Sequence, residues 1–262
     1  MIPGVTEAVE TSRGDEGTTW EIRRDGAVLG TASAGVRRGG TLVNQLDVPV
    51  ADAAVSFDAV LEALRERGEE SVALDVRADD PVLTAAVDGR GLTLGATQML
   101  LDLAVPVAEP PRVTLRPMGA EEFVAYRAHL VTGYAQDLVD SGAVTDAAAA
   151  LEASEESTQD LLPDGVDSPG QHLWTPYDGD VPLGILWVFV EGTHAFIYDI
   201  EVAEERRRRG YGREILDAAA RAAVDLGARE LGLNVFGFNE GARALYERAG
   251  YATTQRTYRI RF

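Results

Sequence analysis

The sequence predicts a protein of the α/β (α+β) class, in which short strands alternate with amphipathic helices in two successive units. Three observations lead to this prediction. Apolar residues recur with period two in several segments and at spacings of three and four in others. Clusters of Gly and Pro separate these segments. The series of strands and helices occurs twice along a chain of 262 residues, a length that suits one large domain or two small ones.

The composition is that of a globular protein, with 45% hydrophobic and 26% charged residues. No apolar run is long enough to cross a bilayer, and the N-terminus lacks a basic region followed by an apolar one, so we expect a cytoplasmic protein. The absence of cysteine excludes disulfides, thiolate metal sites and cysteine nucleophiles. Because His129 and His172 show no ligand spacing, we predict no metal.

The formal net charge is −19 at pH 7. A chain this acidic repels the phosphate backbone of nucleic acids, so we expect no nucleic-acid partner. We also expect no membrane partner, and the sequence does not indicate an oligomeric state. A protein with this charge would tolerate or attract cationic small molecules.

The second part of the chain, residues 112–262, follows a Pro-rich segment near residue 108. Asp146 is placed to cap a helix that ends before Pro163, and Asn239 to cap another that ends at Gly250. A further helix starts after Gly210. The expected strands are 113–118, 173–177, 183–190, 195–202, 230–235 and one or two within 251–262, and the first expected helix is 120–141.

The first part repeats this plan in shortened form. Leu46-Asp47-Val48 aligns with Ile200-Glu201-Val202 at a separation of 154 residues, as does Gly30 with Gly184. Beyond that point the separation is 159, between Gly68 and Gly227, between Leu74-Asp75-Val76 and Leu233-Asn234-Val235, and between Gly91 and Gly250. The alternative is a chance match of short Gly-containing patterns. We therefore expect a loose N-terminal arm over 1–17, a shortened domain over 18–107 and a second domain over 112–262.

Residues 207–213 carry the clearest chemical signal, because an expected strand, 195–202, leads at once into a loop rich in Arg and Gly that opens a helix. A helix N-terminus presents unpaired N–H groups and a partial positive charge. Gly210 and Gly212 let the backbone curl so that successive N–H groups converge on an anion, and the arginines add donors for phosphate oxygens. The alternative is a solvated run of arginines at a helix start.

These residues resemble a known family. Arg207-Arg208-Arg209-Gly210-Tyr211-Gly212 matches the Arg/Gln-x-x-Gly-x-Gly/Ala signature of the GCN5-related N-acetyltransferase (GNAT) superfamily. A second signature follows in Leu233-Asn234-Val235, Asn239, Ala242, Leu245-Tyr246 and Gly250-Tyr251. The resemblance covers residues 196–251 well and 113–195 more loosely. It implies the GNAT fold, a central mixed, mostly antiparallel sheet flanked by helices, with a degenerate GNAT-like domain before it.

The resemblance also implies roles for individual residues, with acetyl-CoA (coenzyme A) as co-substrate. Backbone groups of Ile200 and Val202 would pair with the pantetheine arm, and Asn239 would lie near it, although Asn239 is equally suited to a simple helix cap. Tyr246 would protonate the departing thiolate, since a phenol with a pKa of ~10 carries its proton at neutral pH. It could instead be a packed helix tyrosine. The N–H groups that would hold the pyrophosphate are those of Arg207, Arg208, Arg209, Gly210, Tyr211, Gly212 and Arg213.

The general base is missing from the expected positions. Relatives place a carboxylate or histidine where this chain has Phe196 and Tyr198, or a glutamate where it has Asn234. Asp199 and Glu201 should face the other side of a regular strand. The remaining candidates are Asp178, Glu191, His194 or a water chain.

We therefore predict an acetyl-CoA-dependent N-acetyltransferase that moves an acetyl group to the amine of a small molecule or peptide by direct attack. One alternative resembles mycothiol synthase, and another is a non-catalytic acyl-CoA-binding regulatory module. The first domain would be structural, because Val48-Pro49-Val50-Ala51 replaces the arginine loop and Val87 stands in the place of Tyr246. A group of acids could form a rim that favours a cationic acceptor, or could simply lie on solvated helix faces. These acids are Asp137, Asp140, Glu152, Glu155, Glu156, Asp160 and Asp164.

Overall fold

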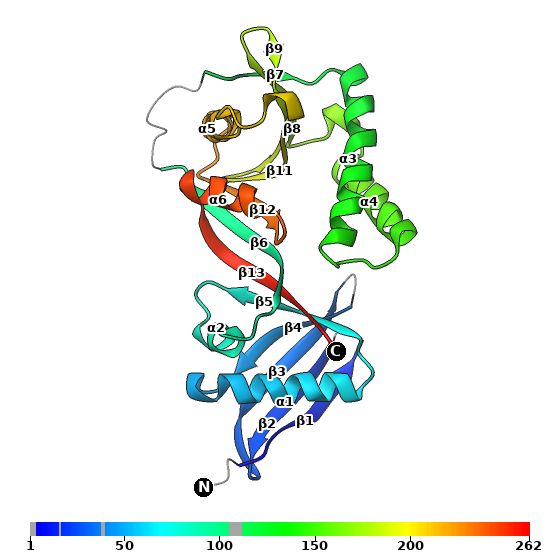
Figure 1. The fold of residues 1–262 in the computed structure, drawn as a ribbon, viewed down its shortest axis with the longest axis vertical. Coiled ribbons are helices and arrows are strands. Elements are labelled where there is room, and N and C mark those ends of the chain that lie inside the picture. Colours follow the sequence, from blue (N-terminus) through cyan, green and yellow to red (C-terminus); the bar gives the residue numbers. More distant parts are fainter. Residues whose placement is uncertain (1–3, 16, 38–39, 105–111) are drawn as a thin grey trace. The chain divides into compact units, whose positions relative to one another are not determined.

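The computed structural model describes residues 4–15, 17–37, 40–104 and 112–262, drawn as a ribbon in Figure 1. Contacts divide the chain into two compact units, which are described separately below. Unit 1 comprises residues up to Thr97 together with Thr254–Phe262, and unit 2 comprises Gln98–Thr253. The expected boundary near residue 108 falls outside the described residues.

Unit 1 is a twisted sheet with two helices packed against one face (Figure 1). The strand order is β1-β2-β3-β4-β5-β13, and Phe57 of α1 packs in the same buried cluster as Trp20 of β2. The elements are β1 (Thr6–Gly14), β2 (Gly17–Arg24), β3 (Ala27–Arg37), β4 (Gly40–Asp47), α1 (Ala53–Glu66), β5 (Ser71–Arg77), α2 (Pro81–Val87) and the start of β6 (Thr93–Asp102), joined by the end of β13 (Ala252–Arg261).

The prediction of a loose arm over residues 1–17 is wrong for the part of this segment that the structure describes. Residues 6–14 form β1, which pairs antiparallel with β2 from Thr6↔Arg24 to Gly14↔Gly17. A polar, Gly-containing segment is compatible with an edge strand, because only one of its edges has to be paired.

Unit 2 has the strand order β7-β8-β10-β11-β12, and β6 follows β12. Every predicted strand and helix of this part is present, and Asp146 caps its helix through the N–H of Ala149. The elements are β7 (Thr114–Pro117), α3 (Ala120–Asp140), α4 (Ala147–Leu161), β8 (Gln171–Asp178), β9 (Val181–Pro182), β10 (Gly184–Glu191), β11 (His194–Val202), α5 (Tyr211–Asp225), β12 (Glu230–Phe236) and α6 (Glu240–Arg248). No helix in the described part of the chain is long and apolar enough to span a membrane.

The internal repeat is present in the structure. The first residues of β5 and β12, of α2 and α6, and of β6 and β13 are each 159 positions apart. Both copies also contain one parallel strand pair in the same register, because Thr41↔Val72 in unit 1 corresponds to Ala195↔Leu231 in unit 2. From β4 in the first copy and β11 in the second, the two copies therefore share element order and the parallel strand pair.

The last strands of the two copies are exchanged. Residues 255–261 of β13 pair antiparallel with β5, so the final strand of the second copy completes the sheet of unit 1. The corresponding strand of the first copy, β6, lies next to β12 instead. Where one or two strands were expected over residues 251–262, the chain forms one.

Candidate active site

A cleft in the sheet of unit 2 opens between β11 and β12. These parallel strands pair from His194↔Glu230 to Ile197↔Leu233, and the pairing ends there. On its other side β11 stays paired with β10 as far as Val202. The second half of β11 therefore has one open edge, which can accept an extended ligand as an added strand.

A β-bulge lies at the point where the two strands part. Trp187 of β10 pairs with Asp199, but its neighbour Val188 pairs with Ile197, so Tyr198 is an extra residue in β11. A bulge breaks the alternation of side chains along a strand. Tyr198 contacts Trp187, and Asp199 lies on that same side, facing α3. The expectation that Asp199 and Glu201 face away from Tyr198 is therefore wrong.

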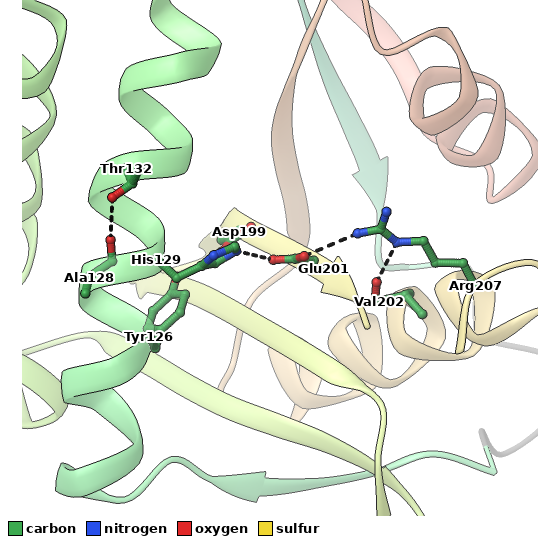
Figure 2. A network of polar contacts seen from close by, with 8 residues as sticks. All are labelled: Tyr126, Ala128, His129, Thr132, Asp199, Glu201, Val202 and Arg207. Carbon is green, nitrogen blue, oxygen red and sulfur yellow. Dashed lines mark hydrogen bonds and ion pairs between the residues drawn. The ribbon is translucent and has the colours of Figure 1, made fainter. Parts of the chain in front are cut away.

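Asp199 is a partly buried carboxylate with one strong neighbour. The hydroxyl of Tyr126 on α3 donates to its Oδ2 over 3.0 Å, and both residues are labelled in Figure 2. Burial raises the pKa of Asp199 to about 6, the hydrogen bond from Tyr126 lowers it, and the nearby charge of Glu201 raises it further. Asp199 is thus a carboxylate that exchanges a proton near neutral pH.

Glu201 links helix α3 to the arginine loop. Its Oε2 lies 2.8 Å from Nε2 of His129, and its Oε1 lies 3.3 Å from Nη2 of Arg207. The Nε of Arg207 also donates to the backbone carbonyl of Val202 over 2.8 Å (Figure 2). The Arg207 side chain thus contacts the open edge of β11 directly.

Tyr246 of α6 is 7% exposed and lines the same cleft. Burial, and then the nearby charge of Asp199, raise its pKa to about 12. A cavity of about 400 Å³ brings Tyr246 and Asp199 together with predicted residues Ile200 and Asn239. The cavity therefore holds a candidate proton acceptor and a candidate proton donor.

Asn239 acts as a helix cap. Its Oδ1 accepts from the N–H of Ala242 over 3.1 Å. Asn239 also lines the cavity, and its contact with the pantetheine arm stays a prediction.

The arginine loop forms a tight turn before α5. Arg208 and Gly210 adopt positive φ, 60° and 87°, and no acceptor for the five successive N–H groups from Arg208 to Gly212 is found among the described residues. Arg208, Arg209 and Gly210 are exposed. Successive N–H groups in such a turn, at the start of a helix, form a concave site for an anion.

Other side chains of the loop serve the fold. The hydroxyl of Tyr211 donates to Asp178 over 2.9 Å, and Nη1 of Arg213 donates to the carbonyl of Arg248 over 2.9 Å. A Cβ on Gly212 would lie 3.0 Å from Cδ2 of Leu245 on α6, so a larger residue at this position would make the Leu245 side chain shift.

The remaining base candidates lie outside the cavity lining. His194 pairs with Glu230 at the opposite end of β11, Asp178 accepts from Tyr211, and Glu191 is exposed at a turn. Sequence reasoning missed Asp199 because it assumed a regular strand. No cluster of three or more His, Asp or Glu side chains suited to a metal occurs in the described ranges.

Unit 1 contains the same bulge without the same chemistry. Ser33 pairs with Gln45 while Ala34 pairs with Val43, so Asn44 is the extra residue, 154 positions before Tyr198. The counterpart of Asp199 is therefore Gln45, an amide that does not titrate. The counterpart of the arginine loop contains Pro49, which has no N–H.

Comparison with known proteins gives consistent matches. A family model described as "Acetyltransferase (GNAT) family" matches residues 143–251. The chain is 37% identical over 147 residues to the "Uncharacterized N-acetyltransferase YycN" of Bacillus subtilis (strain 168), which covers 54% of this chain and 94% of that protein. A second protein of that organism, YdgE, is 36% identical over 146 residues and is covered to 92%.

Solved structures extend the likeness. The crystal structure of YycN superposes with a TM-score of 0.52 at 36% identity, over 54% of this chain and 93% of that one. A GCN5-related N-acetyltransferase from Sphaerobacter thermophilus superposes with a TM-score of 0.57 at 19% identity, over 96% of this chain and 82% of that one. This second likeness shows a shared fold across both units.

Proposed function

The chain belongs to the acetyltransferase (GNAT) family, and from that premise we propose that unit 2 transfers an acetyl group from acetyl-CoA to the amine of a small molecule or peptide. Enzymes of this family use an acyl-CoA co-substrate. Bound acetyl-CoA would supply an acetyl thioester, whose acetyl group passes to the amine while coenzyme A leaves as a thiol. The residues of unit 2 would bind it, orient it and move the protons.

The N–H groups of residues 207–213 are proposed to hold the pyrophosphate. Those of Arg208 to Gly212 lack acceptors within the described residues, and the positive φ of Arg208 and Gly210 curls the backbone around them. An anion placed there gains several N–H bonds and the favourable end of the α5 dipole. The exposed arginine side chains add charge.

The pantetheine arm is proposed to lie along the open edge of β11. The backbone between Ile197 and Val202 is paired only with β10 on its other side. The carbonyl of Val202 accepts from Arg207, so Arg207 would exchange this contact for the incoming ligand. Ile200 and Asn239 line the same cavity and would flank the arm.

Asp199 is proposed as the general base. A primary amine arrives as an ammonium ion at neutral pH and must lose a proton before its nitrogen can attack. With a pKa of about 6, Asp199 is ionised at neutral pH and is basic enough to accept that proton. The nitrogen then forms the new C–N bond and loses its second proton to solvent, while the C–S bond breaks and its electron pair stays on sulfur.

Tyr246 is proposed to donate toward that sulfur. Its pKa of about 12 keeps the hydroxyl protonated throughout the working range. The cavity that raises the pKa of this phenol also raises that of a thiol, because both anions lose solvation there. Tyr246 can therefore stabilise the developing thiolate and transfer its proton, which the protonated Asp199 and solvent restore.

The observation that carries this proposal is the placement of Asp199 and Tyr246 on one cavity beside the open edge of β11. Calorimetric titration with acetyl-CoA should give one equivalent per chain, since unit 1 has Gln45 and Pro49 in the corresponding places. Release of thiol should accompany acetylation across a panel of amines. No binding would refute the proposal, and two equivalents would refute the inactive role of unit 1.

The same assays separate the two other functions considered. A non-catalytic module would bind acetyl-CoA without turnover, and Tyr246→Phe would change no rate. An enzyme similar to mycothiol synthase would prefer a cysteinyl pseudodisaccharide over the other amines.

A further inference from the structure

We infer, on the basis of the proposed acetyl transfer, that the acceptor is a primary amine carried on an aromatic body, bound as its ammonium ion, with no carboxylate or phosphate beside the amine. The cavity of unit 2 that holds Asp199 supplies the observations. It has an acidic lining without arginine, an unpartnered carboxylate and walls of aromatic rings.

The charged residues that line the cavity favour an acceptor with a positive charge. Three carboxylates line the cavity, those of Asp137, Asp199 and Glu201, and His129 is the one basic side chain among its described lining residues. His129 and Arg207 are both engaged by Glu201. A carboxylate or phosphate next to the reacting amine would therefore meet like charge with no free cation to balance it, whereas an ammonium ion would be attracted.

Asp137 gives the clearest sign of a missing cation. It lies on α3, is half-buried and lines the cavity, and its carboxylate has no hydrogen-bond partner among the described residues. Burial, and then the charge of Asp140, raise its pKa. A half-buried carboxylate without a partner is costly, and a cationic ligand would remove that cost.

Aromatic rings form the rest of the walls. The rings of Tyr134 and Phe236 lie 6.3 Å apart, which joins α3 to the end of β12. The ring centroid of Tyr198 on β11 lies 5.1 Å from that of Phe196 on the same strand and 4.7 Å from that of Trp187 on β10. All five rings line the cavity. Such rings attract a cation over their faces and stack on an apolar or aromatic body.

The surface acids on α4 do not contribute to this selection. Of the acids between residues 137 and 167, Asp137 is the one that lines the cavity, while Asp160 and Glu152 are exposed on α4. An acceptor with many charges, such as a polyamine, would need carboxylates spread along its length. The rings instead favour an amine with an aromatic body.

Binding to the protein saturated with coenzyme A tests the inference without requiring turnover. Calorimetry would compare 2-phenylethylamine with L-phenylalanine, which adds a carboxylate, with n-butylamine, which lacks the ring, and with spermidine. We expect 2-phenylethylamine to bind at least tenfold more tightly than each of the other three. Equal or tighter binding of any one of them would overturn the inference.

Variants connect this preference to the named residues. Asp137→Asn should weaken the binding of 2-phenylethylamine at least fivefold. The matched change Asp160→Asn on the exposed face of α4 should leave this affinity unchanged. Phe236→Leu should reduce the preference for 2-phenylethylamine over n-butylamine. If neither Asp137→Asn nor Phe236→Leu has an effect in protein that retains its melting temperature, the inference is wrong.

Binding of acetyl-CoA, measured separately, distinguishes the two levels of failure. If acetyl-CoA binds and another amine is preferred, the acceptor class is wrong and the proposed acetyl transfer stands. If acetyl-CoA does not bind, the proposed function fails and the acceptor class fails with it.

Discussion

The hydroxyl of Tyr126 on α3 donates a hydrogen bond to Oδ2 of Asp199 on β11 over 3.0 Å. This bond joins the helix that lines the cavity to the carboxylate proposed as base. Burial raises the pKa of Asp199, and the bond from Tyr126 opposes that rise. Tyr126 therefore positions Asp199 and also influences the pH at which it accepts a proton.

Replacing Asp199 by Asn should abolish most of the activity. General bases contribute about 10²–10⁴ to rate, so Asp199→Asn should lower kcat/KM for the amine by at least about 100-fold. Steady-state thiol release would measure this, with Asp160→Asn as the matched control and calorimetry to show that acetyl-CoA binding is kept. Activity within a few-fold of wild type would exclude Asp199 as the base.

The pH profile should have an acidic limb set by Asp199. With a pKa of about 6, Asp199 is protonated below that pH and cannot accept a proton, so kcat/KM should rise through pH 6 and then level off. Tyr126→Phe removes a bond that lowers this pKa, and the limb should move to higher pH. A purely structural role for Tyr126 would lower the rate and leave the midpoint in place.

The same variant, Asp199→Asn, should be more stable than wild type at pH 8. The folded-state pKa of Asp199 is raised from 3.8 to about 6, so its ionised form opposes folding above pH 6. A shift of this size corresponds to about 1–3 kcal/mol, and Asn can still accept from Tyr126. Chemical denaturation should show the difference shrinking between pH 6 and 4 and vanishing below pH 4, where folded and unfolded states are both protonated. An equal or lower stability at pH 8 would contradict the buried-charge interpretation.

Two glycines at opposite ends of α5 allow a matched test of the arginine loop as the pyrophosphate site. Gly210 and Gly227 have φ of 87° and 95°, and a Cβ on either would meet no atom within 4 Å. Alanine at each position should cost about 1 kcal/mol of unfolding free energy, because L-residues disfavour this conformation. Gly210→Ala alone should also weaken acetyl-CoA binding in calorimetry. Equal affinities for the two variants would argue against the pyrophosphate site.

Much of the fold could be predicted from the periodicity of apolar residues and from the Gly, Pro and capping residues at the ends of helices and strands. The helix caps at Asp146 and Asn239 and the separation of 159 residues between copies are read from local patterns, because caps and glycine turns act over a few residues. The pairing of β1 and the exchange of β6 and β13 depend on contacts between distant segments, which local patterns do not encode.

Candidate site residues could be proposed from the sequence where they belong to a motif, but not where their position depends on the geometry of a strand. Arg207, Gly210 and Tyr246 belong to motifs that can be recognised by spacing. Asp199 depends on one extra residue in β11, and nothing in the sequence around Tyr198 marks a bulge. Strict alternation of side chains then assigns Asp199 to the wrong face.

The exchange of final strands affects how the protein can fold during synthesis. Domains generally fold in order as they emerge from the ribosome. Here the strand that covers the edge of β5 is residues 255–261, which are translated only after the whole of unit 2. The N-terminal sheet must therefore remain incomplete until residues 255–261 have been translated, and a chain stalled near residue 250 would leave that edge exposed to pairing with other nascent chains.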